Sequence, residues 1–217
     1  MVFIDKDIFM TRRIDSVAVI GGGTMGSGIA AASAAAGFPV LLVERGEQAA
    51  AKALERTLAA AHDEAERQSI AAKLTTATNL DGIGDYDWIC EAIIEDLEAK
   101  RDLLARIESL RKDGSVISTN TSGIPLSTIT AGLPARLRQD IAVTHFFNPV
   151  RVMRLLEIVP DAVIAGAWHV YFVQSEAGAS MDTSVLGRIL EGCSGLNTAL
   201  TGAAVRIITP RAGTRSP

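Results

Sequence analysis

The sequence predicts an α/β fold with a mostly parallel, doubly wound β-sheet. Through the first 160 residues, short strand-like runs alternate with longer helix-like stretches. The strand-like runs are apolar throughout, as expected of strands that helices cover on both faces. A glycine cluster separates the first strand from the first helix, which is where such a sheet places a ligand-binding turn.

The expected elements follow one another in a regular order. Strands are expected at residues 16–20, 39–44, 74–77, 87–92, 115–119, 141–147 and 155–159. Helices are expected from the glycine cluster to Ala36, across 47–73, which is rich in Ala, Glu, Arg and Gln, and across 96–111. The last of these has apolar residues at a 3.6-residue period, namely Leu97, Leu103, Leu104, Ile107 and Leu110.

Composition narrows the class of protein. The 217 residues are 48% hydrophobic and 21% charged, which suits a packed globular core. The net charge of −4, with no basic block, argues against nucleic acid or an anionic membrane as the main partner. No apolar run reaches the roughly 18 residues that a membrane-spanning helix needs. The two cysteines form no zinc pattern, no metal site is expected, and the first residues resemble no targeting signal, so a cytoplasmic location is expected.

The character of the chain changes after Pro160. Residues 161–217 carry eight charged residues, four acidic and four arginine, against 38 in the preceding 160, and they contain no lysine. No heptad or strand alternation is evident there. We therefore expect an N-terminal extension at 1–14, a nucleotide-binding domain at 15–160 and an atypical tail at 161–217, either disordered or derived from a frameshift.

The glycine cluster carries the strongest local signal. In VAVIGGGTMGSG, Gly21, Gly23 and Gly26 form a GxGxxG pattern between a predicted strand and a predicted helix. Such glycines permit a tight turn, a close approach of pyrophosphate to the backbone, and close packing of helix on strand. Thr24 and Met25 lie inside the same turn. The pattern in this context predicts a Rossmann-like fold that binds a dinucleotide at the helix N-terminus.

An acidic residue in the right place strengthens this prediction. Glu44 ends the second strand, eighteen positions after Gly26, where a carboxylate can accept hydrogen bonds from the adenosine ribose. It would repel a 2′-phosphate and so favour NAD over NADP, although the neighbouring Arg45 weakens that preference. The alternative is a structural glycine turn beside a solvated glutamate.

Two further stretches lie at the carboxyl edge of the predicted sheet, where open α/β sheets bind ligands. CEAIIEDLEAK places Glu95 and Lys100 after the fourth strand, and STNTSG places Ser122 after the fifth. From spacing alone the simpler interpretations are favoured. Glu95 would then mark a helix start, Lys100 would be a surface residue, and the hydroxyl residues would be helix caps.

The third stretch is THFFNPVRVMRLLEIVP. His145 ends a strand at the same edge, and Glu157 lies in an apolar strand, where an unpaired carboxylate is unfavourable. Paired with the imidazole, Glu157 would make His145 a general base, and Asn148 could bind the same substrate oxygen. A surface histidine with an edge-strand glutamate explains the spacing equally well.

Together these stretches resemble the NAD-binding domain of the 3-hydroxyacyl-CoA dehydrogenase family, over about Asp15 to Pro160. The resemblance rests on VAVIGGGTMGSGIA, ICEAIIEDLEAK, STNTSGIPLSTI and HFFNPVRVMRLLEIV. It implies oxidation of an L-3-hydroxyacyl-CoA by NAD to the 3-ketoacyl-CoA, as in fatty-acid β-oxidation. The third motif is more like the bacterial multifunctional fatty-acid oxidation proteins than the short mitochondrial enzymes.

The resemblance also implies roles for individual residues. His145 would be the general base, and Glu157 would hold and polarise it. Ser122 and Asn148 match positions that contact the substrate oxygen or the catalytic ring. Two further residues, Glu95 and Lys100, match positions near the nicotinamide and its ribose.

After LLEIV the family continues into a GFxxNR-type motif and a helical domain that closes the acyl-CoA cleft and forms the dimer. Neither is recognisable in residues 161–217, so the helical domain is expected to be absent. Two alternatives therefore stay open beside the dehydrogenase. One is an NAD-binding fragment with little turnover, and the other is a dehydrogenase of a non-CoA 3-hydroxy acid.

Overall fold

The computed structural model describes residues 14–153, 156–160, 170–173 and 205–208. The described strands are β1 Val17–Ile20, β2 Val40–Val43, β3 Leu74–Ala77, β4 Trp88–Glu91, β5 Val116–Thr119, β6 Ile141–Phe146, β7 Leu156–Pro160, β8 Val170–Val173 and β9 Val205–Ile208. The described α-helices are α1 Thr24–Ala35, α2 Glu47–Ala59, α3 Glu64–Ala71, α4 Leu97–Leu110, α5 Leu126–Ile129 and α6 Ala135–Asp140. A short 3₁₀ turn spans Ile83–Asp85.

The described strands form one sheet in the order β3-β2-β1-β4-β5-β6-β7-β8-β9. All pairs from β3 to β6 are parallel, whereas β7, β8 and β9 add antiparallel strands beyond β6. The predicted α/β class with a mostly parallel sheet is therefore confirmed. The strand order reverses between β1 and β4, and this reversal is the point at which such sheets bind ligands.

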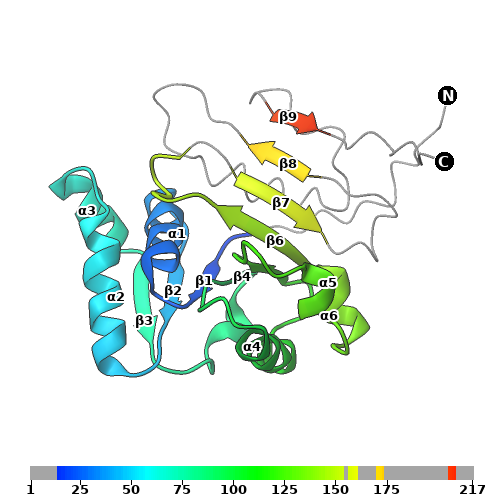
Figure 1. The fold of residues 1–217 in the computed structure, drawn as a ribbon. Helices are drawn as coiled ribbons and strands as arrows, with labels where there is room; N and C mark the ends of the chain where they lie inside the picture. Colours follow the sequence, from blue (N-terminus) through cyan, green and yellow to red (C-terminus); the bar gives the residue numbers. More distant parts are fainter. Residues whose placement is uncertain (1–13, 154–155, 161–169, 174–204, 209–217) are drawn as a thin grey trace.

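Helices cover both faces of the parallel part of the sheet, and each face has its own hydrophobic core (Figure 1). Helices α1 to α3 lie on one face, where Ile29, Ala53 and Ile70 pack with Val19 and Leu42. On the other face α4 to α6 supply Leu104, Ile107, Ile129 and Leu137, which pack with Ile89 and Ile117. Because helices bury both faces of these strands, the sequences of the central strands are apolar throughout.

The prediction of one helix across residues 47–73 is wrong. The helix ends at Ala59 and a second one starts at Glu64. Asp63 caps the second helix, because its carboxylate accepts a hydrogen bond of 2.8 Å from the backbone N–H of Glu66. The Asp63-x-x-Glu66 spacing is typical of a helix start, and it lies hidden in a run of good helix formers.

The remaining differences concern short elements and the tail. Helices α5 and α6 were not predicted, and β7 begins at Leu156, since Leu155 lies outside the described residues. Two strands, β8 and β9, fall in residues 161–217, where the sequence shows no strand pattern. The rest of that tail, and the predicted extension except Ile14, lie outside the described residues.

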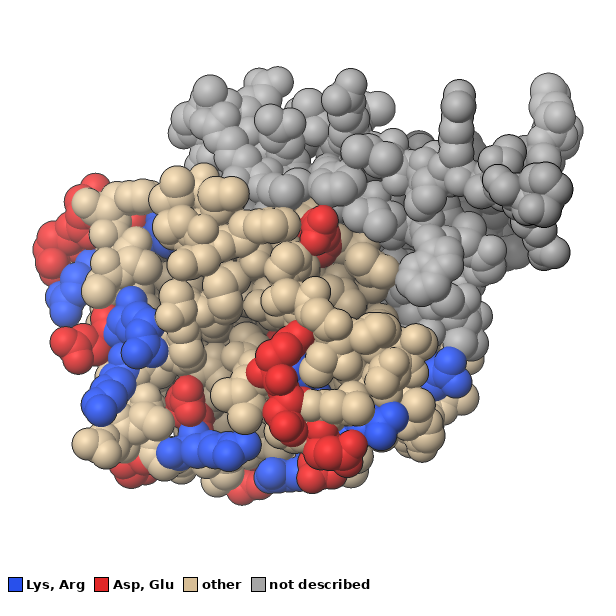
Figure 2. All heavy atoms as spheres, viewed as in Figure 1, with Lys and Arg blue, Asp and Glu red and all other residues tan. Residues whose placement is uncertain are grey.

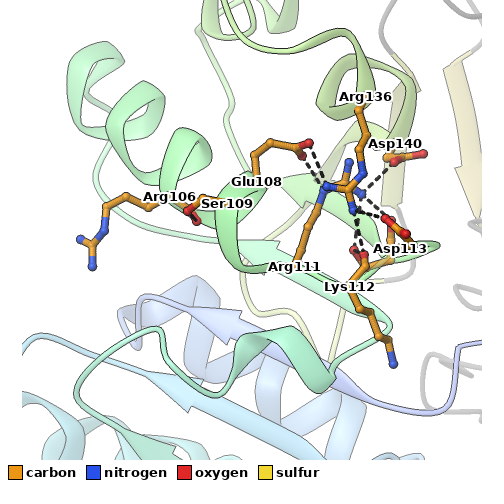
Figure 3. A network of polar contacts seen from close by, with 9 residues as sticks. Arg106, Glu108, Ser109, Arg111, Lys112, Asp113, Arg136 and Asp140 are labelled. Atoms are coloured by element: carbon orange, nitrogen blue, oxygen red, sulfur yellow. Dashed lines mark hydrogen bonds and ion pairs between the residues drawn. The ribbon is translucent and has the colours of Figure 1, made fainter.

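A network of ion pairs joins α4 to α6 at the amino ends of β5 and β6 (Figure 3). Arg111 is buried and contacts Glu108 at 2.5 Å and Asp140 at 2.7 Å. Arg136 contacts Glu108 at 3.1 Å and Asp113 at 2.9 Å. The network lies at the end of the sheet opposite the predicted site, so its role is structural.

Candidate active site

The predicted site residues gather at the carboxyl edge of the parallel strands. The glycine turn follows β1, Glu44 follows β2, Glu95 follows β4 and Ser122 follows β5. His145 is the penultimate residue of β6. On the face drawn in Figure 2, acidic and basic side chains are interspersed around the rim and much of the middle is uncharged.

The glycine turn needs glycine for reasons that differ by position. Gly21 has a φ of 99°, and a Cβ there would lie 2.7 Å from the carbonyl oxygen of Ala92. A Cβ at Gly26 would lie 1.7 Å from the carbonyl oxygen of Gly21, so only glycine lets α1 start this close to β1. A Cβ at Gly23 would meet no atom of the described residues within 4 Å, which leaves that face of the turn open.

Helix α1 begins at this open face. Gly23 is its N-cap residue and no side chain caps it. Thr24 is exposed and Met25 is half-buried at the start of the helix. An uncapped helix N-terminus offers backbone N–H groups and a positive dipole end to an anion. The residues therefore fit the pyrophosphate of a dinucleotide.

Glu44 is fixed beside the same turn. Its Oε1 accepts a hydrogen bond of 2.6 Å from the N–H of Gly22, and its Oε2 accepts one of 3.0 Å from the N–H of Arg45. Arg56 of α2 donates to the carbonyl oxygen of Gly22 from the other side. The carboxylate is thus held at the end of β2, as the sequence predicted.

A pocket of about 750 Å³ opens next to Glu44. Its walls come from the ends of β1, β2 and β4, from the segment after β3, and from α4. Leu80, Ile93, Ile94 and Leu103 give it apolar sides. Because it lies on the β2 side of the sheet, away from β6, it suits the adenosine half of a dinucleotide.

Lys100 lies inside the protein, so the interpretation of it as a surface residue is wrong. Its side chain is 1% exposed, and Nζ lies 2.7 and 3.0 Å from the two carboxylate oxygens of Glu91. Its Nζ also lies 3.5 Å from Glu95. Asp96, next in the chain, caps α4 by accepting a hydrogen bond of 2.8 Å from the N–H of Ala99.

Glu95 holds the segment that follows β5. Its Oε1 accepts hydrogen bonds from the Thr121 hydroxyl and from the N–H groups of Ser122 and Gly123, the last two at 3.0 and 2.9 Å. Burial raises the pKa of the Glu95 carboxyl, but these hydrogen bonds and the Lys100 ammonium outweigh burial and lower it to about 2. Glu95 is therefore an anion at neutral pH.

The hydroxyl residues of STNTSG are not helix caps for α5, whose N-cap residue is Pro125 with no side-chain cap. Ser122 itself is exposed, and so is Asn148, which follows β6 and forms a cis peptide bond with Pro149. Within the described residues neither side chain is hydrogen-bonded to His145. Both lie at the same edge of the sheet as the imidazole.

His145 and Glu157 do meet. They are direct partners in the antiparallel pairing of β6 with β7. Nδ1 of His145 lies 2.8 Å from Oε2 of Glu157, with the side chains 24% and 31% exposed. The Phe147 ring packs at 4.6 Å from the imidazole, centroid to centroid. With Nδ1 bound to a carboxylate, Nε2 is the nitrogen left to exchange a proton with a ligand.

Comparison with known proteins places the chain in a family. The profile of the family described as 3-hydroxyacyl-CoA dehydrogenase, NAD binding domain, matches residues 16–165. The chain belongs to this family. A probable 3-hydroxyacyl-CoA dehydrogenase of Deinococcus radiodurans is 40% identical over 159 residues, which are 68% of this chain and 46% of that protein.

Two comparisons with Mycobacterium tuberculosis give longer matches. A 3-hydroxybutyryl-CoA dehydrogenase of Mycobacterium tuberculosis is 34% identical over 194 residues, covering 85% of this chain and 65% of that protein. The crystal structure of M. tuberculosis FadB2 matches with a TM-score of 0.67 and 30% identity, over 83% of this chain and 62% of that one. The chain thus spans less than two thirds of the length of these relatives.

Membership of this NAD-binding family identifies NAD as the cofactor, and the turn, Glu44 and the pocket fit it. Among the described residues, no helix is long and apolar enough to cross a membrane. In the same part of the chain, no cluster of His, Cys, Asp and Glu could hold a metal ion. Cys90 is buried in β4, and burial raises the pKa of its thiol to about 12, so it is not a reactive thiolate.

Sequence reasoning missed residues that support the family motifs. Glu91 is fully buried at the end of β4, and Asn120 accepts a hydrogen bond of 3.0 Å from the N–H of Phe146. A signal for Glu91 was present, because a carboxylate in an apolar strand needs a partner. The same reason holds for Glu157 in its own apolar strand. Asn120 carried no signal of its own within STNTSG.

Contacts with α1 and with the α2–α3 region hold the turn between β6 and β7 in place. Val150 packs against α1, since a Cβ at Gly28 would lie 2.9 Å from the Val150 side chain. Arg151 donates to the carbonyl oxygen of Ala60 at 3.1 Å and pairs with Glu66 at 2.5 Å. Val152 and Met153 are left exposed. This turn therefore presents apolar side chains to solvent.

Proposed function

We propose that the chain carries the NAD-binding and proton-transfer half of an L-3-hydroxyacyl-CoA dehydrogenase of the fatty-acid β-oxidation type. The observation that carries the proposal is the contact of 2.8 Å between His145 and Glu157 at the same sheet edge as the glycine turn. A cytoplasmic location belongs to the same proposal. The names of the relatives support the acyl-CoA substrate class.

In this proposal NAD, held at the glycine turn, would supply the acceptor for the hydride that leaves C3 of the substrate. Nε2 of His145 removes the proton of the 3-hydroxyl group, which leaves the ketone. Glu157 orients the ring through Nδ1 and stabilises the imidazolium that forms. Asn148 and Ser122 bind the substrate oxygen from the exposed side. Glu44 binds the adenosine ribose, and the turn at Gly21–Gly26 binds the pyrophosphate.

Both Glu95 and Lys100 are proposed to act beside the nicotinamide, Glu95 directly and Lys100 indirectly. Glu95 is partly exposed and lies at the edge of the site, so it can reach a ligand. Lys100 is enclosed between two carboxylates, and we propose that it acts by fixing Glu95.

The test is an NADH absorbance assay on the 217-residue chain with 3-hydroxybutyryl-CoA. We expect turnover that His145→Ala lowers by about 10²- to 10⁴-fold, the usual contribution of a positioned general base. His62→Ala is the matched control, because His62 is exposed at the junction of α2 and α3 and makes no described contact with His145 or Glu157. Equal rates for the two variants would contradict the proposal.

A second candidate follows from the length of the match, which is 46% of the Deinococcus relative. The chain would then bind NAD without turnover, because the match covers less than half of that relative. NAD binding measured by calorimetry, without NADH formation, would support this candidate. Turnover of free 3-hydroxybutyrate, and not of its CoA ester, would instead indicate a non-CoA 3-hydroxy acid.

A further inference from the structure

Glu91, the buried ion-pair partner of Lys100, has no role in the chemistry proposed above. The Glu91 side chain is 0% exposed and the Lys100 side chain 1% exposed. Removing two charges from water is unfavourable unless their hydrogen bonds are well satisfied. The contacts of Glu91 show how they are satisfied and which segments they join.

Each carboxylate oxygen of Glu91 accepts from Lys100 and from one other group. Oε1 accepts a hydrogen bond of 2.8 Å from the N–H of Ile93, just after β4. Oε2 accepts one of 2.5 Å from the hydroxyl of Thr119, the last residue of β5. All four contacts come from donors, so the position suits an ionised carboxylate.

The contact with Thr119 leads on to the strand that carries the predicted base. The backbone oxygen of Glu91 accepts a hydrogen bond of 2.8 Å from the N–H of Asn120. The side-chain oxygen of Asn120 in turn accepts one of 3.0 Å from the N–H of Phe146, the neighbour of His145. Two residues, Asn120 and Phe146, therefore link Glu91 to the backbone of His145.

The contact with Ile93 leads to the cofactor pocket. Ala92, Ile93 and Ile94 line that pocket, and the Ala92 carbonyl oxygen lies 2.7 Å from the position that a Cβ on Gly21 would take. A shift of this segment would therefore move both the pocket wall and the glycine turn.

We propose that Glu91 is a positioning residue, which holds the cofactor pocket wall and the end of β6 in a fixed relative position through Ile93, Thr119 and Asn120. Lys100 supplies the positive charge that faces the buried carboxylate of Glu91. The inference deepens the proposed function, since it treats His145 as the group that has to be placed. Proton transfer tolerates little misplacement, because the donor and acceptor must stay within hydrogen-bond reach.

The test replaces Glu91 by glutamine in the full chain. Glutamine keeps the shape but turns one oxygen into an NH₂ group that faces two donors, so the contacts of that oxygen are lost. The matched control is Asp140→Asn, which removes the charge from a buried ion pair with Arg111 at the opposite end of the sheet. Both variants are expected to have a lower Tm, and both are studied where they are fully folded.

Two measurements separate positioning from stability alone. We expect Glu91→Gln to raise the Kd of NAD by about tenfold and to shift the imidazole resonances of His145 in the NMR spectrum at a fixed pH. In Asp140→Asn both should stay as in the unmodified chain, because distant sites act independently. A Glu91→Gln chain with the NAD affinity and His145 resonances of the control would overturn the proposal.

Thr119→Val keeps the inference testable should Glu91→Gln fail to fold. It removes one hydroxyl at nearly constant volume and leaves the ion pair in place. We expect the His145 resonances to shift in the same direction by less, and unchanged resonances would count against the proposal. Neither the Kd of NAD nor the His145 resonances depend on turnover. If His145 is not the base, the His145→Ala assay will show it, and the effect of Glu91→Gln on these two measurements can still be interpreted.

Discussion

At the scale of single residues, the site depends on a few side chains whose contacts differ in kind. His145 and Glu157 face each other across two strands, whereas Glu44 and Glu95 bind backbone N–H groups of neighbouring turns. A carboxylate on an imidazole sets its proton affinity and orientation, and a carboxylate on N–H groups fixes a loop. The two kinds of contact lead to different mutational effects.

Glu157→Gln should separate orientation from cofactor binding. The amide can still contact Nδ1 of His145 but cannot stabilise an imidazolium, so we expect the rate to fall by roughly two to three orders of magnitude. NAD affinity measured by calorimetry should not change, since Glu157 lies on β7, away from the pocket. An unchanged rate would show that Glu157 is only a strand residue.

Alanine at Gly26 should lower stability, whereas alanine at Gly23 should weaken NAD binding. Gly26→Ala puts a methyl group 1.7 Å from the Gly21 carbonyl oxygen, so we expect a loss of about 1–3 kcal/mol or more in the free energy of unfolding. Gly23 has a φ of −65°, which alanine adopts readily. Gly23→Ala should therefore fold normally and raise the Kd of NAD on the order of tenfold, because its methyl group meets the pyrophosphate.

Denaturant unfolding and calorimetry on both variants check this pair of expectations. Normal NAD affinity in a folded Gly23→Ala chain would show that the pyrophosphate does not approach this residue.

At the scale of elements, the loops after β4 and β5 behave as one unit. Glu95 joins them, because it accepts hydrogen bonds from Thr121, Ser122 and Gly123 while its own loop is held by Lys100. Ser122 therefore takes its position from an anion on a different loop, and the stability of this unit depends on pH.

The pKa of Glu95 lies near 2 in the folded chain against an ordinary value of 4.5. A lowered folded pKa contributes stability that is present above the ordinary value and is lost as the pH falls through the folded one. We expect Glu95→Gln to be less stable than the unmodified chain at neutral pH, with the difference shrinking as the pH falls from about 4.5 toward 2.

Urea unfolding across this pH range measures the difference. Glu98→Gln is the control, because Glu98 is 76% exposed on the same helix and its change should have little effect at any pH. A difference for Glu95→Gln that stays constant down to the lowest pH would contradict the assignment of these contacts.

At the scale of the whole molecule, one sheet edge brings together the glycine turn, the pocket and the candidate base from segments more than a hundred residues apart in sequence. Ligand binding should stabilise that arrangement as a unit. We expect NAD at about 100 times its Kd to stabilise the fold by about 2.7 kcal/mol, which a thermal melt records as a higher Tm. NADP at the same concentration should raise the Tm less, because the Glu44 carboxylate repels its 2′-phosphate.

Glu44→Gln should reduce the difference between the Tm increases that NAD and NADP produce. Equal Tm shifts for NAD and NADP in the unmodified chain would show that Glu44 does not face the ribose.

The sequence alone determined the α/β class and the glycine turn, because each shows in local periodicity or spacing, whereas it indicated His145 as the candidate base through the family resemblance. Strand and helix patterns reflect which faces are buried, and the turn needs glycines within six consecutive residues. Only the tertiary structure decided that Glu157 pairs with His145, because the register of β6 with β7 depends on the turn between them. It also decided that Lys100 lies inside the protein against Glu91, since side chains nine positions apart meet only through the packing of α4 on β4. Local patterns record burial, whereas the choice of partner depends on register and packing between elements.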